Sequence, residues 1–240
     1  WIGDEFGTFL VKVDLEGHVV TVVDTLVDGK PVKSPDHPTM TLQANPTLPM
    51  PAFNLKRSGG YEGLAQSPDG SKLYGMLEGA LFLDGGTMEQ AEGNRGLRII
   101  ELDVAKGEWT GRSWLYPLSQ GGDAIGDFNM IDATTALVIE RDQGAGTPAK
   151  ACADPKTPQP DCFATPALFK RIYKIEMSDA NVGGAVRKIG YIDLMAIADP
   201  QEKKRQGGDE GIYDMPFNTI ENVDVVDATH IVVGDDNNLP

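Results

Sequence analysis

One pattern recurs along this 240-residue chain: a short apolar strand runs directly into a group of acidic residues. The four occurrences are residues 1–5, 73–78, 137–142 and 231–238. In three of them an earlier strand also starts with an acid, which is Glu62, Asp127 or Glu221. A carboxylate inside a buried strand costs free energy unless it has a partner. Acids at the same strand end in each repeat therefore predict a site at which several strands converge.

The two acids of each unit are spaced as the ends of a hairpin would be. The pairs are Glu62 and Glu78, 16 residues apart, Asp127 and Glu140, 13 apart, and Glu221 and Asp235, 14 apart. In the first pair the connection at 67–70 reads Ser-Pro-Asp-Gly, a β-turn sequence with proline second and glycine fourth. An outer hairpin follows each pair. Units of about four short strands, repeated every 40–65 residues or so, are typical of β-propeller blades.

The sequence therefore predicts an all-β protein, a β-propeller of four-stranded blades. About three to four units are visible, whereas propellers close with about four to eight blades. Because the chain also starts and stops at predicted strands, we expect residues 1–240 to be a single, incomplete propeller domain, truncated at both ends, with further blades beyond them. One short helix is expected at 194–205, where Lys and Arg occupy the C-terminal end that the helix dipole favours. With a cysteine loop, this helix forms an insertion around 143–210.

The chain is strongly acidic, with 36 acidic against 21 basic residues and a formal net charge of −15. Such a surface repels phosphate backbones, which argues against nucleic acid as a partner. It suits a secreted or periplasmic protein and accommodates divalent cations. No apolar stretch approaches the roughly 18 residues of a membrane-spanning helix. The chain shows neither a signal peptide nor an initiator methionine, so no targeting signal can be read from it.

The only two cysteines, Cys152 and Cys162, bracket a proline-rich segment. This arrangement predicts a local disulfide, worth about 2–3 kcal/mol in the chain-entropy model. A disulfide in turn indicates an oxidising compartment. A metal-binding cysteine pair is the alternative, but neither a CxxC spacing nor a nearby histidine supports it.

The acidic residues at the strand ends are candidate metal ligands. The set is Asp4, Glu5, Glu62, Asp127, Glu140, Asp142, Glu221, Asp235, Asp236 and Asn237. Around one channel each pair of like charges would cost roughly 3 kcal/mol at about 5 Å and an effective dielectric near 20. Oxygen ligands without histidine or cysteine favour calcium, with magnesium as the second choice, over zinc. Turn capping is the alternative; it explains acids such as Asp14 and Asp69 but not glutamates within apolar strands.

Motifs for nucleophilic catalysis are absent from the sequence: it has no Gly-x-Ser-x-Gly, no plausible Ser-His pairing and no phosphate-binding loop. Catalysis, if present, is then expected to be metal-assisted hydrolysis of an ester. The candidate catalytic residues are Glu62, Asp127 and Glu140, and the candidate substrate-binding residues are Arg57, Arg98 and Arg141. The arginines are candidates because a guanidinium can donate two parallel hydrogen bonds to two oxygens of one phosphate group. For Arg141, an internal ion pair with Glu140 or Asp142 is an equal alternative.

Several short motifs, in order along essentially the whole chain, resemble the phytase-like family described as "esterase-like activity of phytase". They are residues 1–7, 60–65 with the following Ser-Pro-Asp-Gly turn, 125–127, 140–142, 170–173 and 235–238. The resemblance implies a secreted bacterial β-propeller with calcium-dependent phosphoesterase activity, and a domain that extends beyond both ends of this chain. The chain departs from the family at Gly59, where an arginine is common. That departure removes one candidate anion contact.

Three functions are compatible with these observations. The first is a calcium-dependent hydrolase of phosphate esters, with an acidic site at the propeller axis and a small anionic ester as substrate. The second is a lactonase-like hydrolase of carboxylic esters. The third is a non-catalytic calcium-binding propeller with a binding or structural role. The second function differs from the first in its substrate. The third differs in that the cation has no catalytic role.

Overall fold

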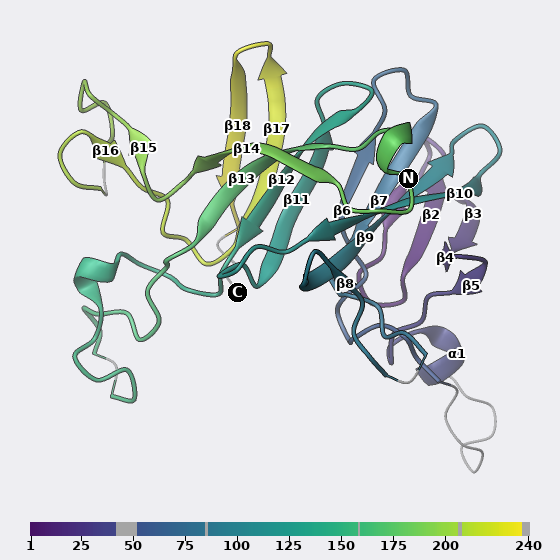
Figure 1. Cartoon of the computed structure of the whole chain (residues 1–240), viewed down its shortest axis with the longest axis horizontal. Coiled ribbons are helices and arrows are strands. Elements are labelled where there is room, and N and C mark those ends of the chain that lie inside the picture. Colours follow the sequence, from purple (N-terminus) through teal and green to yellow (C-terminus); the bar gives the residue numbers. More distant parts are fainter. Residues whose placement is uncertain (42–51, 85, 158, 206–207, 237–240) are drawn as a thin grey trace. The chain divides into compact units, whose positions relative to one another are not determined.

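The computed structural model describes residues 1–41, 52–84, 86–157, 159–205 and 208–236, and it consists mainly of antiparallel strands (Figure 1). Helical structure within these ranges is limited to one turn of α-helix, α1 (Pro38–Thr41), and two 3-10 turns, η1 (Pro148–Lys150) and η2 (Asp179–Asn181). The all-β prediction is confirmed. No helix among the described residues is long and apolar enough to cross a membrane.

The chain divides into two compact units. The first comprises Trp1–Leu118, Phe128–Thr135 and Met177–Arg187, and the second comprises Ser119–Asp127, Ala136–Glu176 and Lys188–Pro240.

The first unit contains a four-stranded antiparallel meander with the order β10-β9-β7-β6, and a short strand, β8, pairs with β9. The strands are β6 (Tyr61–Gln66), β7 (Lys72–Leu77), β8 (Gln90–Ala91), β9 (Asn94–Asp103) and β10 (Glu108–Pro117). The turn between β6 and β7 is the predicted one: Gly70 N–H donates to the Ser67 carbonyl over 2.8 Å. Its positive φ of 72° explains why glycine occupies this position.

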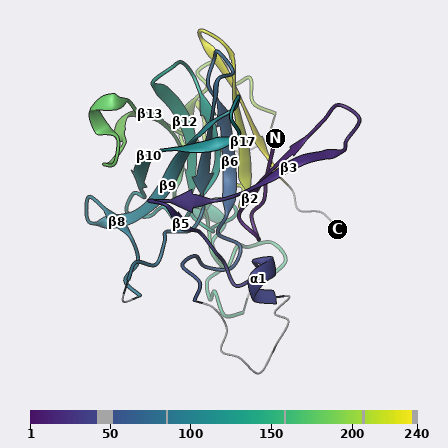
Figure 2. The same ribbon diagram turned by 90° about the vertical axis from the view of Figure 1, so that its right-hand side faces the viewer.

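Five further strands belong to the first unit. They are β1 (Ile2–Gly3), β2 (Phe9–Val13) and β3 (Val19–Asp24), which form one sheet, and β4 (Leu26–Val27) and β5 (Lys30–Pro31), which pair with each other. The β2–β3 hairpin extends away from the other strands of the first unit, as Figure 2 shows.

The core of the first unit packs around Tyr61. Its members include Leu10, Val27, Leu55, Leu73, Leu77, Ile100 and Leu102. The Tyr61 ring lies so close to β7 that a Cβ at Gly75 would be 2.3 Å from it. The Tyr61 hydroxyl forms a buried hydrogen bond of 2.5 Å with Thr25 Oγ1, and burial raises the pKa of this phenol. These contacts fix the start of β6, where Glu62 lies.

A second four-stranded antiparallel sheet has the order β11-β12-β13-β14, and most of its residues belong to the second unit. Its strands are β11 (Ala124–Met130), β12 (Thr135–Arg141), β13 (Lys170–Glu176) and β14 (Arg187–Asp193). The second unit also holds the pairs β15 (Ile197–Ala198) with β16 (Ile212–Tyr213) and β17 (Ile220–Asp227) with β18 (His230–Asp235). All three predicted acid-bounded hairpins are therefore present, as β6–β7, β11–β12 and β17–β18.

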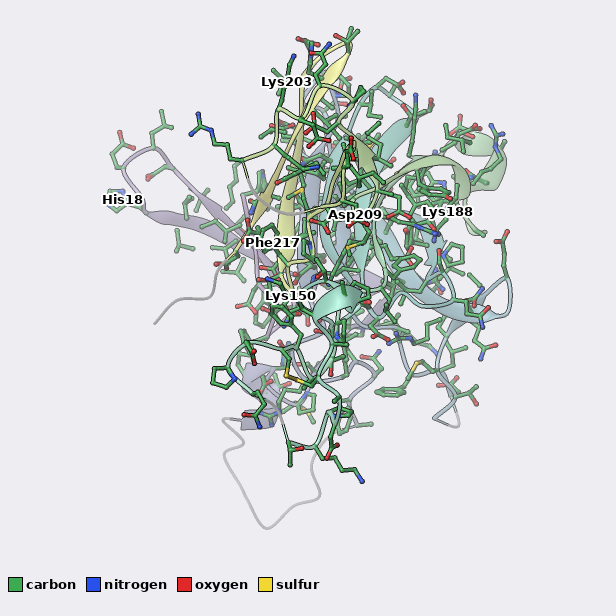
Figure 3. The ribbon with its side chains drawn as sticks, turned by 90° about the vertical axis from the view of Figure 1, so that its left-hand side faces the viewer. His18, Lys150, Lys188, Lys203, Asp209 and Phe217 are labelled. Atoms are coloured by element: carbon green, nitrogen blue, oxygen red, sulfur yellow. A yellow bond between two sulfur atoms is a disulfide. The ribbon has the colours of Figure 1, made fainter. Side chains whose placement is uncertain are left out.

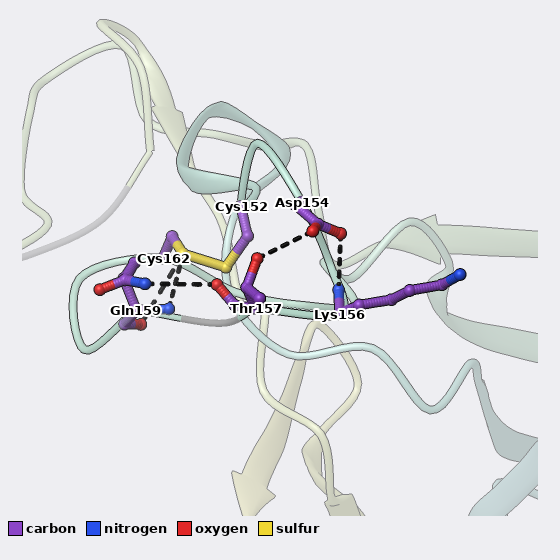
Figure 4. The surroundings of a disulfide bond; sticks show 6 residues. All are labelled: Cys152, Asp154, Lys156, Thr157, Gln159 and Cys162. Atoms are coloured by element: carbon purple, nitrogen blue, oxygen red, sulfur yellow. Dashed lines mark hydrogen bonds between the residues drawn. A yellow bond between two sulfur atoms is a disulfide. The ribbon is translucent and has the colours of Figure 1, made fainter.

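Of the two features expected around 143–210, the disulfide is confirmed and the helix is not, and β13 and β14 of the second sheet also lie in this range. Cys152 and Cys162 form the predicted disulfide, with their Cα atoms 4.9 Å apart (Figure 4). Within the loop Asp154 accepts hydrogen bonds from Lys156 N–H and Thr157 Oγ1 (2.9 and 2.8 Å). The side chains of this loop therefore stabilise a compact turn next to the disulfide.

The helix predicted at 194–205 is wrong: this segment consists of turns and the short strand β15. Asp193 accepts a hydrogen bond from Met195 N–H over 3.0 Å, and Asp199 accepts from two backbone N–H groups, of Lys203 and Lys204, at 2.9 and 2.8 Å. Aspartates that bind nearby backbone donors compete with helix formation. Pro200 also disfavours helical backbone at Asp199.

Candidate functional site

Three glutamates converge in the first unit. Glu5 follows β1, Glu62 is the second residue of β6, and Glu78 directly follows β7. Each contributes a carboxylate oxygen, and these oxygens lie within 4.8 Å of one another. All three residues are half-buried. We call Glu5, Glu62 and Glu78 the glutamate cluster; among the described residues it is the group of acidic, histidine or cysteine side chains that could hold a metal ion.

Backbone pairing explains why these segments meet. Strands β6 and β7 are antiparallel with Tyr61 opposite Leu77, so the start of one lies beside the end of the other. Gly60 links them to the N-terminal segment: its N–H donates to the Glu5 carbonyl, and its own carbonyl accepts from Glu78 N–H, both over 2.8 Å. A Cβ at Gly60 would lie 2.4 Å from the Glu5 carbonyl oxygen. Only glycine permits this approach without displacing the backbone.

The loop before β6 supplies the neighbours of the glutamate cluster. Ser58 Oγ donates a hydrogen bond to Glu5 Oε1. Lys56 Nζ lies 3.2 Å from Glu78 Oε2, and its side chain is 46% exposed. Arg57 extends from the same loop with a 68% exposed side chain, 2.6 Å from Asp36 Oδ1. One exposed lysine thus accompanies three carboxylates, and solvent screens its charge.

Other predicted ligands are occupied by donors of the second unit. The Asp127 carboxylate accepts from Val223 N–H over 2.8 Å. Glu221 forms an ion pair with Arg141 over 2.8 Å. The internal ion pair considered for Arg141 therefore exists, but its partner is Glu221 rather than Glu140 or Asp142. The Nε atom of Arg141 is buried without a hydrogen-bond partner among the described residues.

Asp142 pairs with a fully buried lysine. Lys170 Nζ lies 2.9 Å from its carboxylate, and the backbone N–H groups of Leu168 and Gly144 also donate to it, over 2.7 and 3.0 Å. Burial alone would raise the pKa of Asp142, but the hydrogen bonds from Lys170 and Leu168 outweigh it and the pKa is lowered. Burial also lowers the pKa of Lys170, against the opposing effect of Asp142.

Glu140 is fully buried in the second unit. Its carboxylate accepts from Ser119 N–H over 2.5 Å and from Lys188 Nζ over 2.7 Å. Neither Ser119 nor Lys188 belongs to a recognisable motif, and they lie 21 and 48 positions from Glu140. The strand-end pattern indicates Glu140, but nothing in the sequence marks either of its partners.

The remaining predicted residues lie in local structure. Asp4 accepts from Gly7 N–H, as a turn-capping aspartate does. Arg98 is buried, and its guanidinium donates to Glu89 (2.6 and 2.9 Å) and to Ser113 Oγ (2.8 Å). Asp235 ends β18 and Asp236 follows it, whereas Asn237 lies outside the described residues.

Of the predicted ligand set, the structure groups Glu5 and Glu62, and it adds Glu78, which the repeat contains but the ligand set omits. The histidines lie elsewhere: His18, on the exposed β2–β3 hairpin (Figure 3), pairs with Asp14 over 3.1 Å. Three oxygen donors from three segments are a suitable partial shell for a hard cation such as calcium.

Comparison with known proteins gives one family and one relative. The model of the family described as "Phytase-like: Esterase-like activity of phytase" matches residues 1–239. An "Uncharacterized secreted protein" of Arthroderma benhamiae is 29% identical over 119 residues, which cover 44% of this chain. The chain spans 22% of that protein's length. No solved structure matches the chain.

Proposed function

The chain belongs to the phytase-like family, and on this premise we propose that it is a secreted, calcium-dependent hydrolase of phosphate esters on a β-propeller scaffold. The family description names an esterase-like activity, which indicates a hydrolase. Calcium dependence is supported by the glutamate cluster, in which carboxylate oxygens of Glu5, Glu62 and Glu78 lie within 4.8 Å of one another. Secretion is supported by the intrachain disulfide and by the name of the relative.

The strand order of the two larger sheets supports a propeller fold. The two sheets β6-β7-β9-β10 and β11-β12-β13-β14 are four-stranded antiparallel meanders, each starting with a hairpin bounded by acids. Propeller blades are four-stranded sheets of this kind. The pair β17–β18 repeats the acid-bounded hairpin, as the first half of a further blade would.

The donor set of the glutamate cluster fits calcium. Without a cation each of its like-charged pairs would cost about 3 kcal/mol at an effective dielectric near 20. The charge of Lys56 offsets part of this repulsion. Because the lysine side chain is exposed, solvent screens its charge and the offset is small. Ser58 orients Glu5 and Lys56 orients Glu78. Of the candidate catalytic residues Glu62, Asp127 and Glu140, Glu62 is the one in the glutamate cluster, and we assign it as the general base. A bound calcium would supply polarisation of the ester oxygen and a more acidic water.

Arg57 supports an anionic substrate. Its guanidinium is exposed on the loop that carries Lys56 and Ser58, and Asp36 holds one end of it at 2.6 Å. A guanidinium can donate two parallel hydrogen bonds to two oxygens of one phosphate group, and Arg57 lies in sequence between the two residues that contact the glutamate cluster. Neutral carboxylic esters would gain nothing from this charge.

The test is turnover of a panel of phosphomonoesters, phosphodiesters and lactones, with calcium and after chelation. We expect phosphate-ester hydrolysis that chelation abolishes and that Glu62→Gln lowers by about 100-fold, the usual contribution of a general base. Glu16→Gln, in the exposed β2–β3 turn, is the matched control and should retain full activity. Turnover of phosphate esters that persists after chelation would contradict the proposal.

A structural calcium site is the second candidate. It is favoured because Glu5 lies between β1 and β2 while Glu62 and Glu78 bound β6–β7, so one ion would cross-link the β1-β2-β3 sheet to the β10-β9-β7-β6 sheet. Calcium would then raise the melting temperature without any turnover on the panel.

A further inference from the structure

A second polar cluster lies in the second unit and shares no residue with the glutamate cluster. It consists of Ser119, Glu140, Tyr173 and Lys188, and we call it the serine cluster (Lys188 is labelled in Figure 3). Ser119 Oγ accepts a hydrogen bond from Lys188 Nζ over 2.8 Å. The same Oγ lies 3.3 Å from Glu140 Oε2 and 3.0 Å from the Tyr173 hydroxyl. One serine oxygen thus contacts a cation, a carboxylate and a phenol.

The sheet fixes three members of the serine cluster. Glu140, Tyr173 and Lys188 come from β12, β13 and β14, which are consecutive strands. Lys188 Nζ is 2.7 Å from Glu140 Oε2 and 4.1 Å from the centre of the Tyr173 ring. A lysine held by a carboxylate on one side and a ring on the other has little rotational freedom. Its ammonium is therefore directed at Ser119.

The turn that carries Ser119 is built around the Glu140 carboxylate. Ser119 N–H donates to Glu140 Oε1 over 2.5 Å, and Gly122 N–H donates to the Ser119 carbonyl over 3.1 Å. A Cβ at Gly122 would lie 2.1 Å from Glu140 Oε1, so glycine is required there. The backbone thereby holds Oγ and Glu140 in a fixed relation.

Ser119 is partly exposed, whereas the acid beside it is not. Ser119 is half-buried and its neighbours Gln120 and Gly121 are exposed, whereas Glu140 is 0% exposed. The Lys188 side chain is 18% exposed. The turn that carries Ser119 therefore lies at the surface, whereas the carboxylate that would accept its proton is shielded from water.

We propose that Ser119 is the nucleophile of a metal-independent centre that hydrolyses carboxylic esters, with Glu140 as proton acceptor and Lys188 stabilising the negative charge on the attacking oxygen. A nucleophile and a base within hydrogen-bond reach, with the base oriented by a third group, is the arrangement of covalent catalysis. An ion pair between Lys188 and Glu140 would stabilise the sheet by itself. It does not require an accessible hydroxyl in contact with both charges.

The steps balance with water as the co-reactant. Ser119 Oγ bonds to the carbonyl carbon of the ester while its proton passes to Glu140. The bond to the leaving alkoxide then breaks, and the alkoxide takes that proton from Glu140. Water attacks the resulting acyl-serine and gives its proton to Glu140, the carboxylic acid leaves, and Ser119 Oγ recovers a proton. This activity goes beyond the proposed phosphate-ester hydrolysis and uses none of the residues of the glutamate cluster.

The experiment is labelling with a fluorophosphonate probe in the presence of a chelator, followed by peptide mass spectrometry and by hydrolysis of p-nitrophenyl acetate. We expect one adduct, on Ser119, and an acetate hydrolysis rate that chelation leaves unchanged. Ser119→Ala should remove both signals, and Lys188→Met should lower the labelling rate by about 100-fold. Ser71→Ala is the matched control, because the exposed Ser71 hydroxyl also contacts a carboxylate, that of Asp69 at 2.9 Å, but has no lysine donating to it in the structure. It should label as wild type.

Several results would overturn the proposal. They are no adduct on the folded wild-type protein, labelling that persists in Ser119→Ala, or equal labelling rates in wild type and Lys188→Met. Ser119→Cys, labelled with iodoacetamide, guards against a folding defect in the alanine variant: it should react faster than the same cysteine combined with Lys188→Met. Equal rates in that pair would also contradict the assigned role of Lys188. Because the chelator removes calcium in all of these experiments, a negative result would contradict the role of Ser119 without bearing on the calcium-dependent hydrolysis of phosphate esters.

Discussion

In the first unit Glu5, Glu62 and Glu78 lie within 4.8 Å of one another beside a lysine whose side chain is 46% exposed. In the second unit Glu221, Asp142 and Glu140 each have their own cation, and the side chains of Arg141, Lys170 and Lys188 are 7%, 0% and 18% exposed. The acids of both units follow the same strand-end pattern. The first group therefore gathers negative charge that a ligand could neutralise, and the second group is neutralised by the protein itself.

The largest loss of stability is expected at Lys170, because it is the most deeply buried of the three cations in the second unit. Lys170→Met removes a fully buried cation and leaves Asp142 without its partner. Breaking a buried pair in this way costs about 3–5 kcal/mol. Urea unfolding measures the loss. Lys174→Met, at an exposed position of the same strand, is the control and should change stability by less than about 0.5 kcal/mol; equal losses in the two variants would show that the pair is not the cause.

Neutralising one acid in each unit should have opposite effects. In calcium-free buffer Glu5→Gln removes repulsion within the glutamate cluster, while Ser58 can still donate to the glutamine carbonyl, and should raise the free energy of unfolding by about 1–2 kcal/mol. Glu221→Gln leaves the buried Arg141 without its anion and should lower that free energy by about 1–3 kcal/mol. Both follow from urea titrations with a chelator present. Changes of the same sign would break the comparison between the units.

These partners show how far the sequence could predict the site. The hairpins β6–β7, β11–β12 and β17–β18 follow from alternating strands and local turn residues, and the disulfide follows from having only two cysteines. The cations could not be predicted, because Lys188 lies 48 positions from Glu140 and Glu221 lies 80 from Arg141. Lys170 opens a strand segment, Lys-Arg-Ile-Tyr-Lys, in which nothing local marks it as fully buried. The prediction of a helix at 194–205 was wrong because it relied on basic residues at the C-terminal end. Asp199, which accepts hydrogen bonds from nearby backbone N–H groups, and Pro200 both disfavour helical backbone there.

A smaller effect is expected from acid titration of the second unit. The pKa of Asp142 is lowered from 3.8, so its charged form is favoured in the folded protein. Its contribution to stability is complete above the unfolded pKa and is lost as the pH falls through the folded one. Asp142→Asn should therefore flatten the stability curve below about pH 4 relative to wild type. Parallel curves, measured by urea unfolding between pH 5 and pH 2, would contradict this assignment.

Calcium binding by the glutamate cluster can be measured as the difference in melting temperature with and without calcium. A ligand that binds the folded state alone raises this temperature by an amount that grows with the ratio of the ligand concentration to its Kd. We predict a calcium-dependent rise in wild type and in Glu221→Gln, and little or no rise in Glu5→Gln, Glu62→Gln and Glu78→Gln. No rise in wild type, or an undiminished rise in the three glutamate-cluster variants, would contradict the account.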